Sequence, residues 1–252
     1  MMADLDVHPD ADGLAAAAAG LFVSEARSAI AARGRFVVAL SGGSTPLGAY
    51  RRLAALEFAS KTDWRHIHLF WGDERCVPPD DPDSNYGQAL RTLIGQVPIP
   101  AAQVHRVRGE LAPDVAAREY ERDLHTYFVA PGAIAAAEDW PRFDLILLGL
   151  GVDGHTASLF PGAVVLHERT RWVVGYWVDS VRGWRVTLTP PAINAARVVA
   201  FLVSGTDKAE RLKQVLTGPW QPDVFPAQII RPNRGQSRWL IDAAAAARLQ
   251  RG

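Results

Sequence analysis

A carboxylate and an imidazole, Asp153 and His155, stand two residues apart in the sequence, on either side of Gly154. They follow the apolar run 143–148, which has the composition of a buried strand and ends in glycines. Open α/β sheets place their ligand sites at such strand ends. Because histidine titrates near neutral pH, His155 can act as a general base toward water, with Asp153 holding one ring nitrogen. The alternative is a tight turn in which Asp153 caps a helix and His155 has no chemical role.

A second candidate is the segment 41–46, Ser-Gly-Gly-Ser-Thr-Pro, which lies between an apolar run and a helical pattern. Backbone N–H groups and hydroxyls at a helix N-terminus bind phosphate or another anion, because the helix dipole and the unpaired donors point the same way. The segment lacks the Gly-Lys-Ser/Thr ending of a P-loop and is not a dinucleotide-binding G-x-G-x-x-G. An ordinary turn that needs glycine for its backbone geometry is the alternative.

Charged residues beyond other predicted strands complete the set of candidates. Asp73, Glu74 and Arg75 follow the run 66–71. A guanidinium group suits phosphate or carboxylate through its bidentate fork, and Asp73 can accept a proton. A surface ion pair explains the same three residues. Lys208, in a turn after a strand, and Arg185, before a strand pair, can each reach a phosphate, although a surface position explains either residue alone.

The sequence does not predict a metal site or a disulfide. His66 and His68 alternate on one strand, but a third ligand at a diagnostic spacing is missing. The acidic segment 80–83 lacks the glycine and the terminal glutamate of a calcium loop. Cys76 is the single cysteine, which excludes an internal disulfide and a cysteine metal cage and is compatible with a reducing compartment.

The composition of the 252 residues indicates a globular protein, with 48% hydrophobic and 21% charged residues. Lysine plus arginine equals aspartate plus glutamate at 27 each, so no basic excess points to nucleic acid or an anionic membrane as a partner. The first six residues are acidic where a signal peptide is basic, and no window approaches the length of a membrane span. We therefore expect a soluble, cytoplasmic protein.

Alternating strand and helix patterns predict an α/β fold in which helices cover both faces of a mostly parallel sheet. We expect one domain over residues 1–252, with a small β lobe around 172–188. The predicted strands are 35–40, 66–71, 104–107, 143–148, 172–177, 184–188, 198–203, 227–230 and 238–241. The predicted helices are 11–33, one after Pro46, 84–94, 113–128, a short one after Pro191, one ending at 216 and a final alanine-rich one.

Several segments together resemble the 6-phosphogluconolactonase family, of the glucosamine-6-phosphate isomerase/deaminase-like superfamily. The similarity follows the family's order through most of the chain, and the stretch 149–161 is its most specific part. The matching segments are 41–46, 71–75, 83–86, 149–161, 185–189 and 205–209.

The resemblance implies hydrolysis of 6-phospho-D-glucono-1,5-lactone to 6-phospho-D-gluconate in the oxidative pentose phosphate pathway. It implies a Rossmann-like three-layer α/β/α fold that needs no metal or cofactor, and a small sugar-phosphate lactone as partner rather than nucleic acid or membrane. It also implies that His155 is the general base and Asp153 its supporting carboxylate. The positions that match the sugar-phosphate site are Gly42, Gly43, Ser44, Thr45, Asp73, Arg75, Arg185 and Lys208.

Two other functions fit parts of the same pattern. Related isomerases and deaminases of amino-sugar phosphates carry a glutamate five residues after the histidine, where this chain has Phe160. Phenylalanine cannot supply the second acid or base that isomerisation needs. A sugar-phosphate-sensing module that binds without reacting is the other alternative. Against it, no helix-turn-helix segment precedes the domain, and both Asp153 and His155 are present.

Overall fold

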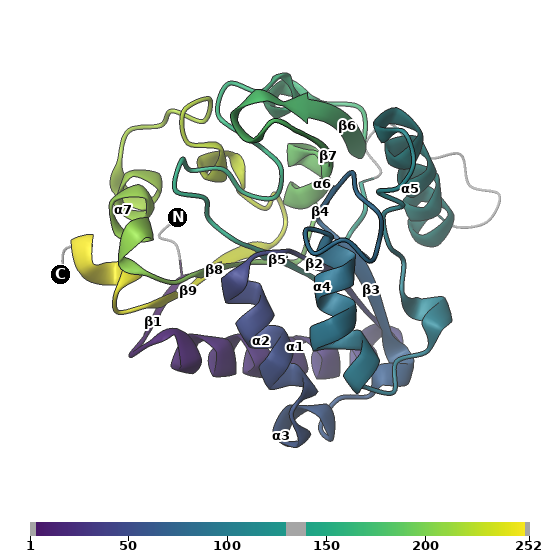
Figure 1. The fold of residues 1–252 in the computed structure, drawn as a ribbon. Coiled ribbons are helices and arrows are strands. Elements are labelled where there is room, and N and C mark those ends of the chain that lie inside the picture. Colours follow the sequence, from purple (N-terminus) through teal and green to yellow (C-terminus); the bar gives the residue numbers. More distant parts are fainter. Residues whose placement is uncertain (1–3, 130–139, 250–252) are drawn as a thin grey trace.

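The structure is a computed structural model that describes residues 4–129 and 140–249. Its centre is a six-stranded, all-parallel sheet in the order β1-β9-β8-β5-β2-β3. Helices lie on both faces of this sheet, as the sequence predicted: α1 and α2 on one side, α6 and α7 on the other (Figure 1). The six strands are β1 (Asp4–His8), β2 (Phe36–Leu40), β3 (Ile67–Trp71), β5 (Leu145–Leu148), β8 (Val198–Val203) and β9 (Gln236–Asp242).

The strand order reverses between β2 and β5. From β2 the chain moves outward to β3, and then returns to build β5, β8 and β9 on the other side of β2. Every residue of β2, β5 and β8 is buried, which explains their continuous apolar runs, because strands of a covered parallel sheet contact protein on both faces. Doubly wound sheets bind ligands outside the carboxyl ends of the strands at such a reversal.

A second, three-stranded antiparallel sheet forms the small β lobe that the sequence predicted. Its order is β4-β7-β6, with β4 (Asp73–Arg75), β7 (Gly183–Leu188) and β6 (Val173–Val178). Asp73, Glu74 and Arg75 therefore do not simply follow a strand. They form a short strand of their own, in which Glu74 pairs with Val186.

The helices follow the predicted pattern closely. Asp10 caps the first of them by accepting a hydrogen bond from the Gly13 N–H, and Gly34 ends it in the left-handed conformation with φ of 74°. Ser84 caps the fourth by accepting from the Gly87 N–H. The helices are α1 (Ala11–Arg33), α2 (Ser44–Ala54), α3 (Leu56–Ala59), α4 (Asn85–Thr92), α5 (Pro113–Phe128), α6 (Pro190–Asn194) and α7 (Ala209–Thr217).

Three element predictions were wrong, and one strand was missed. The segment 104–107 is not a strand, because only Val104 forms a single bridge, to Leu69. The segment 227–230 is mostly a 3-10 turn, Pro226–Ile229. The final helix is a single 3-10 turn, Ala245–Arg248. The strand β1 was not predicted, because it is an exposed edge strand with charged residues and shows little of the apolar pattern of a core strand.

Helix α1 also corrects the expectation about membrane-length segments. It has 23 residues and is long and apolar enough to cross a membrane by length and composition, yet half of its most apolar window is buried inside the fold. Phe22 on α1 packs edge-on against Phe36 of β2, with ring centroids 5.2 Å apart. In this structure α1 is a core helix that covers one face of the sheet.

Candidate active site

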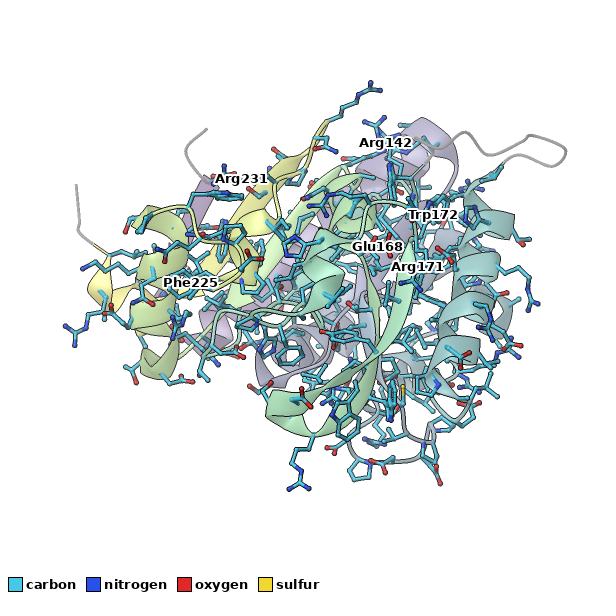
Figure 2. The ribbon with its side chains drawn as sticks, turned by 90° about the horizontal axis from the view of Figure 1, so that it is seen from above. Arg142, Glu168, Arg171, Trp172, Phe225 and Arg231 are labelled. Carbon is cyan, nitrogen blue, oxygen red and sulfur yellow. The ribbon has the colours of Figure 1, made fainter. Side chains whose placement is uncertain are left out.

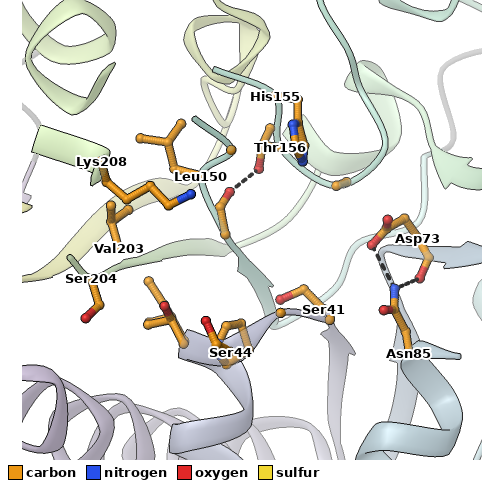
Figure 3. Close-up of a pocket in the computed structure, with 18 of the residues that line it drawn as sticks. Ser41, Ser44, Asp73, Asn85, Leu150, His155, Thr156, Val203, Ser204 and Lys208 are labelled. Carbon is orange, nitrogen blue, oxygen red and sulfur yellow. Dashed lines mark hydrogen bonds between the residues drawn. The ribbon is translucent and has the colours of Figure 1, made fainter. Parts of the chain in front are cut away.

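A cavity of about 210 Å³ opens at the carboxyl edge of the parallel sheet, where the strand order reverses. The loops after β2, β5 and β8 line it, together with residues from β4 and the start of α4. Figure 3 shows His155 and Thr156 on one side of the cavity, Ser44 on the facing side, Lys208 entering from one end and Asp73 with Asn85 at the other. The lining residues are Ser41–Pro46, Asp73, Arg75, Asn85, Gly149–Gly151, His155–Ala157, Leu202–Ser204 and Lys208.

The loop before α2 presents unpaired backbone donors to the cavity. Among the described residues, no side chain caps the N-terminus of α2, where Gly43 adopts φ of 102°, a conformation that favours glycine. Tyr50, which is 1% exposed, fixes the loop from behind: its hydroxyl donates to the Ser41 carbonyl at 2.8 Å and accepts from the Ser41 N–H at 2.9 Å. The free N–H groups of the first turn and the nearby hydroxyls of Ser44 and Thr45 suit an anionic ligand.

His155 and Asp153 form a direct pair, as the sequence suggested. The imidazole Nδ1 lies 2.6 Å from Asp153 Oδ1, which also accepts the backbone N–H of His155 at 3.1 Å. Burial alone would raise the pKa of Asp153, but these hydrogen bonds outweigh burial and lower it. The imidazole stacks on the Phe160 ring, with centroids 4.3 Å apart. His155 lines the cavity while Asp153 lies behind it, so Nε2 is the ring nitrogen left for a ligand.

Position 151 must be glycine, because the side chains of His155 and Asp153 pack against its backbone. A Cβ atom on Gly151 would lie 2.1 Å from His155 Nδ1 and 2.6 Å from Asp153 Oδ1, so a side chain there would displace the imidazole. The Gly151 N–H donates to the His155 carbonyl at 2.8 Å, which closes the turn. Arg211 supports it from outside by donating to the Val152 carbonyl at 2.9 Å. The backbone around the pair is therefore held at several points.

Asp73 and Glu74 lie in a buried network beside the pair. Asp73 lines the cavity and accepts from Ser158 Oγ at 2.7 Å and from Asn85 Nδ2 at 3.3 Å. Glu74 accepts the backbone N–H groups of Arg75, Asn85 and Tyr86 at 2.7–2.8 Å. Burial raises the pKa of Glu74 to about 7 in spite of these donors. Glu74 thus holds the start of α4 against β4 and does not line the cavity.

Three cations were predicted to contact the substrate, and two of them line the cavity. Lys208 and Arg75 do so, and Arg75 also donates to the Asp83 carbonyl at 2.6 Å. Arg185 is not among the lining residues; it pairs with Arg75 across β4 and β7, and donates to the Trp184 carbonyl at 2.9 Å. Burial and then the neighbouring Arg75 lower the pKa of Arg185. Its contact with substrate remains a prediction.

Several lining residues were not singled out from the sequence. Asn85 is 2% exposed and joins Asp73 to the cavity wall, while Thr156 donates to the Gly149 carbonyl at 2.8 Å (Figure 3). Gly149, Gly151, Ala157 and Ser204 also line the cavity. Most of them lie inside or next to segments that carried the family resemblance, which is the signal that could have found them.

Metal ligands do not gather in the part of the chain that the structure describes, where no group of three histidine, cysteine, aspartate or glutamate side chains is placed to hold an ion. His68 instead contacts a second imidazole, with Nδ1 3.1 Å from His105 Nε2. Burial, followed by the charges of His105 and Arg35, lowers the pKa of His68 to about 4. This pair lies in an aromatic cluster with Phe70 and is not part of the cavity.

The fold and the cavity define a doubly wound α/β protein whose ligand site lies at the strand-order reversal. Residues 9–239 match the family model described as glucosamine-6-phosphate isomerases/6-phosphogluconolactonase, and the chain belongs to this family. It is 41% identical to a 6-phosphogluconolactonase of Nostoc over 99% of both chains, and 40% identical to one of Mycobacterium bovis with the same coverage. The structure of 6-phosphogluconolactonase from Trypanosoma cruzi is similar, with TM-score 0.87, 28% identity and coverage of 100% of this chain and 99% of that one.

Proposed function

We propose that this protein hydrolyses 6-phospho-D-glucono-1,5-lactone to 6-phospho-D-gluconate in the oxidative pentose phosphate pathway. The observation that carries the proposal is the His155–Asp153 pair, which opens onto the same cavity as the unpaired donors before α2. Full-length relatives with about 40% identity are 6-phosphogluconolactonases, which supports this reaction over others in the family.

The geometry suits His155 as a general base. The ionised carboxylate of Asp153 accepts a hydrogen bond from the Nδ1–H group of His155. The proton therefore stays on Nδ1, and the lone pair of Nε2 is free to take a proton from water. The water oxygen forms a bond to C1 of the lactone, and the ring C1–O bond then breaks. The imidazolium returns its proton to the departing ring oxygen. A lactone is an activated ester, so this route needs no covalent intermediate.

The other lining groups orient the substrate and carry its charge. The N–H groups and hydroxyls at Gly42, Gly43, Ser44 and Thr45, together with Lys208, would bind the phosphate and so hold C1 near His155. Backbone N–H groups of the loop 42–44 or the Arg75 guanidinium would stabilise the oxyanion that forms at C1. Asp73 would bind the sugar at the end of the cavity opposite Lys208, and Arg185, the strand partner of Arg75, would add positive charge that attracts the phosphate.

Isomerisation of an amino-sugar phosphate is the competing reaction within the family. The position that carries a glutamate in such enzymes holds Phe160, whose ring packs flat against the His155 imidazole. An apolar ring at that place supports a hydrolase with one base rather than an isomerase with two. We also infer a cytoplasmic enzyme of a single domain over residues 1–252 that acts on a small molecule without a cofactor, nucleic acid or membrane.

Initial rates on freshly prepared lactone test the proposal. We expect hydrolysis well above the spontaneous rate in the same buffer, and no release of ammonia from glucosamine 6-phosphate. Turnover of glucosamine 6-phosphate would favour the isomerase or deaminase reaction. Binding of the lactone or its product with no acceleration over buffer would indicate a sugar-phosphate sensor instead.

A further inference from the structure

A second cavity, of about 300 Å³, lies at the amino ends of the parallel strands. It shares no lining residue with the candidate active site, and the five-residue strand β2, about 16 Å long, separates the two. In Figure 2, Arg142 on its rim lies far from Phe225, which packs beside Gly154 near the first site. The second cavity is lined by Arg33, Arg35, Val37, Phe128, Arg142, Asp144 and Arg197.

The lining contains four guanidinium groups and one carboxylate, which contacts two of them. Asp144 is 5% exposed, and its Oδ1 lies 2.8 Å from Arg33 Nη2 and 3.3 Å from Arg197 Nε. Its Oδ2 accepts the Val37 N–H at 2.9 Å. Both carboxylate oxygens are therefore already occupied. Glu25, which interacts electrostatically with Arg33 and Asp144, does not line the cavity.

The other two guanidinium groups have no carboxylate partner within residues 4–129 and 140–249 of the structure. Arg35 lies over the Tyr127 ring at 4.7 Å, and Arg142 donates to the Arg234 carbonyl at 3.4 Å. Neither contact neutralises charge. Among the described residues, the lining thus carries four positive charges and one negative charge, a local excess of three, in a chain whose formal net charge is zero.

Four guanidinium groups around one cavity repel one another electrostatically, and a bound anion would offset this repulsion. Burial, followed by the charges of Arg33 and Arg142, lowers the pKa of Arg197, so the three groups are close enough to repel one another. Guanidinium forks match phosphate oxygens in pairs. A volume of about 300 Å³ is at the small end of pockets for small molecules and exceeds the space of one phosphate group.

We infer that the cavity bounded by Arg33, Arg35, Arg142 and Arg197 binds a small anion with two phosphate groups. Arg33 and Arg197, held by Asp144, form the fixed side of this site, and Arg35 and Arg142 supply positive charge that no carboxylate among the described residues neutralises. The site is independent of lactone hydrolysis, because it lies at the other end of the sheet.

Calorimetric titration with inorganic pyrophosphate, at matched ionic strength, tests the inference. The double variant Arg35→Gln and Arg142→Gln leaves the Asp144 ion pairs intact, and we expect it to weaken one pyrophosphate-binding event at least tenfold. That event must persist in Lys208→Gln, which alters the candidate active site. The matched control is Arg51→Gln, because Arg51 is exposed on α2 and lines neither cavity.

Equal pyrophosphate affinity in the wild-type chain and the double variant would overturn the inference. So would citrate binding as tightly as pyrophosphate, because the site would then not select phosphate. Melting curves check that the double variant folds. Arg142→Gln alone, which removes one contact to a carbonyl, is the milder variant and should weaken the same binding event at least threefold.

Discussion

Two pairs of polar side chains lie at the carboxyl edge of the sheet, and they differ in how far each is exposed. The side chains of His155 and Asp153, after β5, are 30% and 38% exposed. Asp73 and Glu74, in β4, are 7% and 2% exposed. The first cluster leaves one ring nitrogen for a ligand, whereas donors of the fold occupy oxygens of both carboxylates in the second.

The same chemical group therefore behaves differently at neighbouring places. Burial raises the pKa of Glu74 to about 7. For Asp153, burial acts in the same direction, but the hydrogen bonds from His155 prevail and lower the pKa. Separation of carboxylates by their surroundings is how active sites divide roles among them. We infer that Asp153 acts on the reaction through the imidazole, while the Asp73–Glu74 cluster fixes the cavity wall.

A glycine serves each cluster, and each excludes a side chain for a different reason. A Cβ on Gly151 would collide with the His155 ring, and a Cβ on Gly42 would lie 1.8 Å from Asn85 Oδ1. Gly42 belongs to the loop before α2, so Asn85 joins that loop to Asp73. The loop before α2 and the buried cluster are therefore one packed unit, and the segment after His155 contacts it through the hydrogen bond from Ser158 to Asp73.

Replacing His155 with alanine should have the largest effect on the reaction. Loss of the general base should lower kcat by about 10²- to 10⁴-fold, because a positioned base contributes that much. The melting temperature should change little, since the side chain is 30% exposed. His167→Ala is the matched control: His167 pairs with Asp223 at 3.2 Å and lies outside the cavity. Near-full activity in His155→Ala would contradict the mechanism.

Asp153→Asn should reduce kcat by about 10²-fold, less than loss of the base itself. An amide can donate to Nδ1, which would place the ring proton on Nε2 and block proton abstraction from water. The partial exposure of Asp153 lets water compensate in part. The control is Asp223→Asn in the surface pair, measured on the same substrate. Unchanged turnover in Asp153→Asn would show that the imidazole needs no carboxylate.

Ser158→Ala should act on stability more than on chemistry. Ser158 is 1% exposed, and its hydroxyl donates to Asp73 Oδ2 at 2.7 Å. Removing a donor from a buried carboxylate costs about 2 kcal/mol, and chemical denaturation should show a loss of that size. Ser28→Ala, an exposed change on α1, should alter the unfolding free energy by less than about 0.5 kcal/mol. A stable Ser158→Ala chain with little activity would assign this bond to catalysis instead.

Most of the fold was predictable because its central elements carry strong local signals. The bounds of α1, α5 and β8 agree with the sequence pattern, since caps, an N-terminal proline and continuous apolar runs specify them. The strand β1 escaped prediction because it depends on pairing with β9 at the far end of the chain. The segment 104–107 failed for the opposite reason: its apolar residues pack on the sheet without extending it.

The parts of the site that directly follow strands could be predicted from the sequence. The glycine loop 41–46 and the pair of Asp153 and His155 follow strands, and a sheet that reverses its order must bring these loops together. The role of Glu74 was not visible, because its donors come from the start of α4, beyond a loop. No local pattern separates an inward-facing carboxylate from a surface one when the partners belong to different elements.

The pH dependence of stability should give the smallest effect and the most direct view of the buried cluster. Glu74 has a usual pKa of 4.5, which burial raises to about 7 in the folded chain. Between these values the folded state keeps a proton that the unfolded state releases, so this contribution to stability is full below 4.5 and is lost as pH rises through 7. From pH 6 to 8 the loss should be about 1 kcal/mol, and Glu74→Gln should lack it. Unfolding free energies of both chains across this range measure the difference. Parallel curves would mean that Glu74 is ionised throughout. Its backbone donors would then outweigh burial, as the hydrogen bonds do at Asp153.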